Sequence, residues 1–168
     1  MICPDCGHDN IDGVDACDHC GQNLSSVDIP GPKAGLQRAI METPLRDLQP
    51  AIALTVTPGD SVSRAVKLMR DKRQGSVLVM EGRTLVGIFT ERDALTRLTG
   101  RAYNPETLMV SEVMTRDPKT LRDEDTLAYA MHCMAVGSYR HIPILGKDGP
   151  PRFISVRGVL RYLNDHAR

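Results

Sequence analysis

Residues 85–93 read LVGIFTERD, an apolar run that gives way to polar and charged residues at Thr90. The run up to Phe89 predicts a buried strand. Thr90 followed by Asp93 is typical of a helix start, because a hydroxyl and a carboxylate at this spacing cap backbone N–H groups that have no partner within the helix. The stretch therefore predicts a strand that runs directly into a helix over residues 91–98.

The same pattern returns 65 residues later, where residues 150–158 read PPRFISVRG. Residues 44–98 moved forward by 65 fall on residues 109–163 without a gap. Few positions are identical, Thr55/Thr120 and Asp60/Asp125 among them, but the apolar pattern agrees throughout. Such self-similarity indicates a structural repeat with two copies.

Each copy predicts the order β-α-β-β-α after a short apolar turn at Leu45 or Val110. Both first helices begin at an acidic residue followed by a hydroxyl, Asp60-Ser61 and Asp125-Thr126, which suits the helix dipole. One copy is too small to cover both faces of its sheet, so we expect a mixed α/β (α+β) fold in which the two pack with approximate twofold symmetry. The expected strands are 53–57, 76–80 and 85–89 in the first copy and 119–122, 141–145 and 152–154 in the second.

The N-terminal segment is predicted to be a metal site. Four of the five cysteines form two pairs, each with a two-residue gap and a glycine after the second cysteine. Such a gap lets both sulfurs of a pair face one ion, and four thiolates hold Zn²⁺ tetrahedrally. Residues 1–24 have too few apolar side chains to fold on a core alone, so the metal must supply the folding free energy. The predicted ligands are Cys3, Cys6, Cys17 and Cys20.

Two alternatives stay open for these cysteines, namely two disulfides and a rubredoxin-like iron site with a redox function. Because four cysteine sulfurs complete the coordination shell of zinc, we expect His8 and His19 to be exposed. The segment resembles the short zinc ribbons at the ends of many bacterial and archaeal proteins, over residues 3–20. A site without an open ligand position predicts a structural rather than a catalytic metal.

Charge divides the chain near residue 35. The whole chain has 21 acidic and 21 basic residues, but residues 1–35 hold six aspartates and one lysine. An acidic ribbon repels phosphate, so we expect it to contact a protein partner rather than nucleic acid, and a nucleic-acid-associated regulator is the alternative. Residues 25–35, with two prolines and two glycines, predict a linker that isolates the ribbon. The predicted organisation is a ribbon at 1–24, a linker at 25–39 and repeats at 40–103 and 104–168.

The body resembles a tandem pair of cystathionine-β-synthase (CBS) domains, also called a Bateman module, over about residues 40–166. The resemblance is carried by GSVLVM at 75–80, LVGIFTERD at 85–93, YRHIPI at 139–144 and FISVRG at 153–158. It implies a regulatory module that binds an adenine nucleotide (AMP, ADP or ATP), or S-adenosylmethionine, in clefts between the copies. It also implies pairing into a homodimer through the CBS repeats.

The family motif Gly-apolar-x-Thr-x-x-Asp falls on residues 87–93, and the resemblance implies that Asp93 accepts both ribose hydroxyls while Thr90 bonds the ribose or phosphate. Arg92 lies beside them. A helix capping box explains Thr90 and Asp93 equally well without a ligand. In the second copy Ser155 and Arg157 match, but Gly158 replaces the aspartate. We therefore expect one good nucleotide site per chain.

The resemblance also implies groups for the other ends of the nucleotide. Arg140 and His141 would contact phosphate, because an arginine fork suits phosphate oxygens; the alternatives are a solvated surface charge and a packed strand end. Backbone amides and apolar walls would hold adenine, although ordinary core residues give the same pattern. These predicted wall residues are Val56, Thr57, Pro58, Val77, Ile142 and Pro143.

The remaining features predict little chemistry. The chain lacks nucleophile-elbow, P-loop and zinc-protease motifs, so we expect no enzymatic activity. A membrane span needs roughly 20 apolar residues, and no such run or secretory leader is present, so the expected location is the cytoplasm. Cys133 and His132 match Leu68 and Lys67, which predicts a buried inert thiol and an exposed imidazole.

Overall fold

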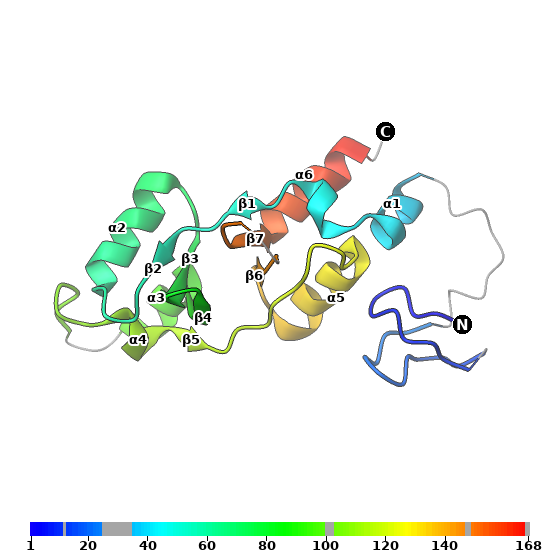
Figure 1. The fold of residues 1–168 in the computed structure, drawn as a ribbon, viewed down its shortest axis with the longest axis horizontal. Helices are drawn as coiled ribbons and strands as arrows, with labels where there is room; N and C mark the ends of the chain where they lie inside the picture. The colour runs from blue at the N-terminus through cyan, green and yellow to red at the C-terminus, as the bar shows by residue number, and fades with distance from the viewer. Residues whose placement is uncertain (12, 25–34, 100–102, 147–148, 167–168) are drawn as a thin grey trace. The chain divides into compact units, whose positions relative to one another are not determined.

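The computed structural model describes residues 1–11, 13–24, 35–99, 103–146 and 149–166 (Figure 1). Two compact units are present: unit 1 consists of Met1–Ala51 and Thr120–Arg168, and unit 2 of Ile52–Lys119. Residues 25–34 of the predicted linker lie outside the described residues. Within the described ranges, every helix is too short or too polar to cross a membrane.

Unit 2 contains a four-stranded sheet in the order β2-β3-β4-β5. Its central pair is antiparallel, with Ser76 opposite Thr90 at one end and Glu81 opposite Thr84 at the other. β4 runs directly into α3, as the sequence predicts. The elements are β2 (Thr55–Val56), α2 (Val62–Lys72), β3 (Ser76–Glu81), β4 (Thr84–Thr90), α3 (Glu91–Leu98), α4 (Val110–Val113) and β5 (Thr115–Arg116).

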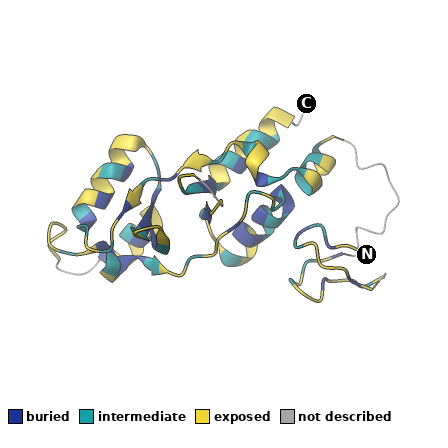
Figure 2. Ribbon diagram, viewed as in Figure 1, coloured by how far each residue is buried: buried dark blue, intermediate teal, exposed yellow. Residues whose placement is uncertain are grey.

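Unit 1 contains the N-terminal ribbon and a second sheet, in the order β1-β7-β6. Leu121 extends this sheet by a parallel bridge to Ile144, just as β2 runs parallel to β3 in unit 2. The elements are α1 (Leu36–Glu42), the 3-10 helix η1 (Leu45–Leu48), β1 (Ala51–Ile52), α5 (Leu127–Gly137), β6 (His141–Ile144), β7 (Arg152–Ser155) and α6 (Val156–His166). Both units bury mainly aliphatic side chains and methionine. Figure 2 shows the buried residues along the ribbon in dark blue.

The mixed α/β fold and the two repeats are confirmed, down to the helix ends. Ser61 and Thr126, 65 residues apart, each accept a hydrogen bond from a backbone N–H three residues later, at 3.2 Å. The helices end at Arg73 and Ser138, again 65 residues apart, both in the left-handed conformation at φ 54° and 53°.

Two strands are shorter than predicted. The strand expected over 53–57 forms only at Thr55–Val56, and the one expected over 119–122 is reduced to the bridge at Leu121. The reason is a turn at the same place in each copy. The N–H of Thr57 donates to the Asp60 carboxylate at 2.6 Å, and the N–H of Arg122 donates to Asp125 at 2.7 Å, so neither continues a sheet ladder.

The opening segment of each repeat packs on the core of the other repeat. In unit 1, Leu45 N donates to Asp125 O at 2.8 Å and its side chain is fully buried beside Leu127. In unit 2, Val110 N donates to Asp60 O at 2.9 Å. Since these pairs are related by the 65-residue shift, the exchange is reciprocal.

The exchange brings β5 very close to β4. A Cβ atom on Gly87 would lie 2.5 Å from the Met114 sulfur and 3.0 Å from the carbonyl oxygen of Thr115. A side chain at this position would therefore push β5 away from the sheet. The glycine of the family motif has a packing role here.

We predict that core truncations in the opening segments destabilise the opposite repeat. Leu45→Ala should cost about 2–5 kcal/mol and increase hydrogen exchange in β6 and β7. Val110→Ala should increase exchange in β3 and β4 instead. Hydrogen–deuterium exchange with mass spectrometry measures both, with the exposed Val136→Ala as control. Loosening confined to the repeat that carries each mutation would contradict the exchange.

Candidate metal centre and nucleotide site

The four predicted cysteine ligands converge. Their sulfurs all lie within 4.8 Å of one another, with Cys3–Cys20 at 3.7 Å and Cys6–Cys17 at 3.6 Å. A tetrahedral ion with metal–sulfur bonds of about 2.3 Å separates its ligands by about 3.8 Å. A disulfide would need about 2.05 Å, so the sulfurs have the spacing of metal ligands. The donor set suits zinc and iron alike.

The backbone prepares this geometry in two similar turns, 14 residues apart. Gly7 N donates to Cys3 O at 2.9 Å and Gly21 N to Cys17 O at 2.8 Å. Both glycines have positive φ, 71° and 74°, which a side chain would strain. Burial raises the pKa of the Cys17 thiol, but hydrogen bonds from the backbone N–H of Cys20 and His19 and from Asn10 outweigh it and lower the pKa to about 6.

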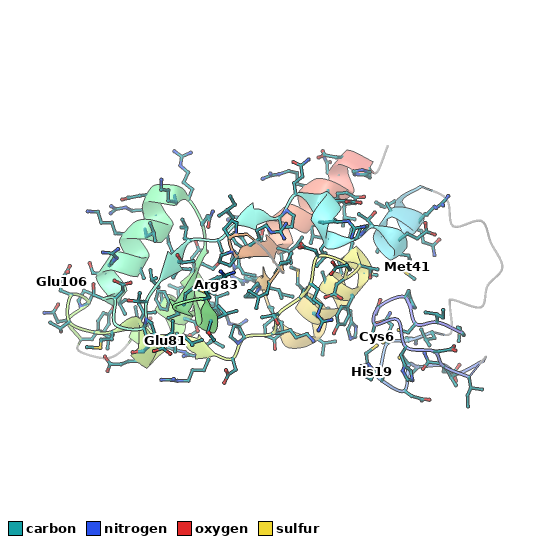
Figure 3. The ribbon with its side chains drawn as sticks, in the orientation of Figure 1. Cys6, His19, Met41, Glu81, Arg83 and Glu106 are labelled. Atoms are coloured by element: carbon teal, nitrogen blue, oxygen red, sulfur yellow. The ribbon has the colours of Figure 1, made fainter. Side chains whose placement is uncertain are left out.

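The ring of His8 stacks on that of His19, 5.4 Å apart between centroids, and both residues are exposed, as predicted. Figure 3 labels His19 and the ligand Cys6 in the ribbon. The ribbon is not isolated, however. Pro4 O accepts a hydrogen bond from Thr126 Oγ1 at 3.2 Å, and Asp5 Oδ2 lies 3.7 Å from His132 Nδ1. The His132 side chain is 18% exposed, so the prediction of an exposed imidazole is wrong. Cys133 is buried, as predicted.

Asp93 lies in the first turn of α3 and is only 8% exposed. Its Oδ2 accepts hydrogen bonds from Thr90 N at 3.0 Å and Thr90 Oγ1 at 2.6 Å, while Asp93 N donates to Thr90 Oγ1 at 3.2 Å. This is a closed capping box, the alternative left open by the sequence. The pair therefore stabilises the helix start whether or not it also binds a ligand.

The other carboxylate oxygen of Asp93 has partners that the sequence analysis missed. Thr115 Oγ1 donates to Oδ1 at 3.0 Å, and Arg97 Nε lies 3.4 Å from it. Arg97 also donates to Val113 O at 3.0 Å. The spacing of Asp93 and Arg97 along α3 is a local signal for this pair. No local signal in the sequence predicts the contact of Thr115, because the exchange of opening segments brings this residue of the second repeat to α3.

The hydrogen bonds to the Asp93 carboxylate limit how a ribose could bind to it. A carboxylate offers about four lone-pair positions, and hydrogen bonds fill three of them. A ribose diol must therefore replace the Thr90 or Thr115 hydroxyl. Ser76, opposite Thr90 in the sheet, is 1% exposed, and its hydroxyl has no hydrogen-bond partner among the described residues. Thr90, Asp93 and Ser76 thus gather at one end of the β3–β4 pair.

The second copy keeps half of the capping box. Gly158 N donates to Ser155 Oγ at 3.1 Å, with no carboxylate at this position. Arg152, at the position of Gly87, forms an ion pair with Asp123 at 2.6 Å. Ser155 lies opposite His141, at the β6–β7 end that corresponds to Ser76 and Thr90.

The remaining predicted residues fall into three groups. The cores contain Val56, Val77 and Ile142, and Pro143 is also buried. Thr57 donates hydrogen bonds to the Asp60 carboxylate from both its N–H and its hydroxyl. The bond from the N–H lowers the pKa of Asp60 most, and the hydroxyl and the charge of Arg64 lower it further. Exposed or half-buried at the surface are Pro58, Arg92, Arg140, His141 and Arg157.

Comparison with known proteins identifies the fold. The chain matches the CBS domain family at residues 38–100 and 110–165, and it belongs to that family. It is 42% identical to the CBS domain-containing protein CBSCBSPB3 of Arabidopsis thaliana over 94 residues, which are 56% of this chain and 17% of that protein. The chain thus spans less than a fifth of this relative.

Solved structures agree with the assignment. The CBS-domain containing protein ATU1752 from Agrobacterium tumefaciens has 27% identity and a TM-score of 0.65, over 71% of this chain and 98% of that one. CBSX2, solved in complex with AMP, has 24% identity and a TM-score of 0.60, over 74% of this chain and 98% of that one. The latter shows the fold alone.

Proposed function

We propose that the protein is a regulatory module that senses an adenine nucleotide, AMP, ADP or ATP, and has no catalytic activity of its own. The observation that carries the proposal is the carboxylate of Asp93 at the strand–helix junction of a CBS repeat. Ser76, opposite Thr90 at this end of the sheet, has a hydroxyl without a hydrogen-bond partner among the described residues. The AMP found with CBSX2 supports the ligand class. S-adenosylmethionine, which carries the same ribose diol, is the alternative ligand.

The proposed contacts follow the chemistry of the nucleotide. Asp93 and Thr90 bind the ribose, since one carboxylate accepts both hydroxyls of a vicinal diol, and Arg92 is beside them. Arg140 and His141 contact phosphate. Ser76 binds the ribose together with Asp93 and Thr90. The second cleft has only Ser155 and Arg157, so one nucleotide binds per chain. Adenine lies against Val56, Thr57, Pro58, Val77, Ile142 and Pro143, chiefly through their backbone, because several of these side chains are buried in the cores.

Calorimetry with the three nucleotides and S-adenosylmethionine tests this proposal. We expect at least one binder at about one per chain, and Asp93→Ala should weaken it by about 2 kcal/mol. Because the mutation also removes the contact with Thr115, Thr115→Val is the matched control: it removes that partner of Asp93 but leaves the carboxylate free for ribose, so binding should not weaken. Affinity unchanged by Asp93→Ala would leave only the capping role, and four non-binders would refute the sensing function.

We propose that the four-cysteine site holds structural zinc. The spacing of the sulfurs supports an ion, and the acidic, closed site gives it no open coordination position. Iron in the same cage would make a redox protein. The ribbon's charge favours a protein partner over nucleic acid, and the cytoplasm is the proposed location.

Metal analysis of the purified chain separates zinc from iron. We expect one zinc per chain and a colourless protein. Cys17→Ser should abolish metal binding, whereas Cys133→Ala, which changes a cysteine outside the cluster, should leave it intact. A red protein with visible absorbance would establish iron instead.

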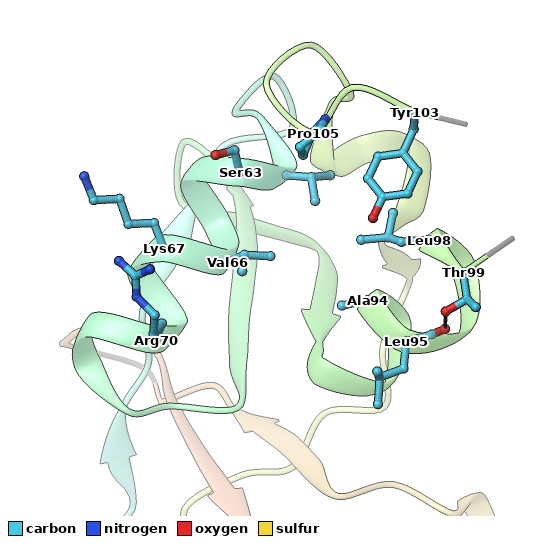
Figure 4. A pocket seen from close by; sticks show the side chains of 11 residues that line it. Ser63, Val66, Lys67, Arg70, Ala94, Leu95, Leu98, Thr99, Tyr103 and Pro105 are labelled. Carbon is cyan, nitrogen blue, oxygen red and sulfur yellow. Dashed lines mark hydrogen bonds between the residues drawn. The ribbon is translucent and has the colours of Figure 1, made fainter. Parts of the chain in front are cut away.

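We also propose that the protein pairs with a second copy through helices α2 and α3. A groove of about 580 Å³ runs between them, with Val66 and Lys67 on one wall, Ala94 and Leu95 on the other, and Tyr103 at one end (Figure 4). Leu95 is 70% exposed, and its counterpart Leu160 on α6 is also exposed. Large exposed apolar residues in a groove mark an interaction surface.

Light scattering tests this pairing. We expect wild type at twice the 18.5 kDa chain mass. Leu95→Arg should give monomer, because it places a charge in the apolar contact. Thr96→Arg, on the same helix but outside the groove, should not. A monomeric wild type, or a dimer that tolerates Leu95→Arg, would contradict this interface.

A further inference from the structure

The ribbon contacts one helix at two adjacent residues. Pro4 O accepts a hydrogen bond from the hydroxyl of Thr126, and the Asp5 carboxylate lies 3.7 Å from the His132 ring nitrogen. Thr126 caps α5 with the same hydroxyl, by accepting from Tyr129 N. Both ribbon residues lie between the ligands Cys3 and Cys6, so the metal-binding turn itself forms the contact.

Asp5 is unusual among the acidic residues of the ribbon. It is 5% exposed, and its Oδ2 has no hydrogen-bond partner among the described residues. Asp9, in contrast, has a side chain that is 84% exposed, and Asp15 and Asp18 are exposed as well. A buried carboxylate is costly unless a positive group compensates it. His132 faces it, with its ring nitrogen 3.7 Å from the carboxylate.

The composition of α5 supplies an independent observation. Its counterpart α2, VSRAVKLMRDK, carries five charged residues, whereas α5, LAYAMHCMAVG, carries no Asp, Glu, Lys or Arg. A helix that is apolar all round must be covered on its outer side. Ala128 and Cys133 are buried on α5, while their counterparts Ser63 and Leu68 are only half-buried on α2. Helix α1 covers part of α5, and the ribbon contact lies at its N-terminal half.

We propose that the ribbon is a metal-dependent cover for the N-terminal half of α5, held by Asp5–His132 and Pro4–Thr126. The inference rests on the proposed metal site and is independent of nucleotide binding. A ribbon of this size folds only with its metal, so loss of the ion releases Pro4 and Asp5 and exposes α5 to water. Linkage is reciprocal, so the docked helix strengthens metal binding by the same factor. The exposure of α5 in unit 1 thereby depends on whether the metal is bound.

Hydrogen exchange of the full chain, with and without a zinc chelator, tests the cover. Chelation should speed exchange in the N-terminal half of α5 about tenfold, because a covered helix turn becomes exposed. Exchange in α2 should stay unchanged, as the internal control. Metal analysis of the same sample separates the two proposals. If the purified chain holds no metal, both the metal site and the cover are refuted. If the chain holds zinc but the exchange in α5 is unchanged after chelation, only the cover is refuted.

Point variants in the ribbon and in α5 remove the contact between them while the metal stays bound. Asp5→Asn should release zinc to a coloured chelator about tenfold faster and expose α5, since the contact of the buried carboxylate with His132 is lost. Asp15→Asn removes an equal charge from the ribbon without touching α5 and should behave as wild type. His132→Ala should reproduce Asp5→Asn, and Lys67→Ala, its counterpart on α2, should not. Equal zinc release from the Asp5 and Asp15 variants would overturn the proposal.

Discussion

The two CBS repeats hold each other together by a reciprocal exchange of their opening segments. Each repeat supplies a short sheet and two helices, but the cores close only when Leu45 enters one and Val110 the other. Backbone hydrogen bonds to Asp125 and Asp60 fix both segments in place. Unit 1 is therefore assembled from two separate stretches of chain, Met1–Ala51 and Thr120–Arg168, whereas unit 2 is the continuous stretch Ile52–Lys119. A single repeat cut out by its sequence boundaries would lack part of its core.

The exchange also shapes the proposed ligand site. Thr115 belongs to the second repeat by sequence, yet its hydroxyl bonds the Asp93 carboxylate of the first. Arg97 ties the same segment to α3 through Val113. A nucleotide that takes over oxygens of Asp93 competes with a residue next to the exchanged segment. Under the proposed function, binding and repeat packing would be linked through this one carboxylate.

Local signals in the sequence predicted much of this molecule. The strand–helix junction at Thr90, the caps at Ser61 and Thr126, and the cysteine pairs all depend on neighbours within a few residues, and the structure confirms their geometry. The features that the sequence did not predict are contacts between distant residues. The 65-residue shift reveals two copies but not which core Leu45 joins. It equates His132 with Lys67, although only His132 faces Asp5.

The Asp93 end of the β3–β4 pair is the proposed binding place of the adenine nucleotide. Nuclear magnetic resonance of the isotopically labelled chain during titration with AMP, ADP or ATP tests it most directly. The account predicts that the amide signals of Thr90, Asp93 and Ser76 shift together and saturate at about one nucleotide per chain, while residues 1–24 stay unchanged. Saturable shifts confined to other residues, with these three amides unmoved, would contradict it.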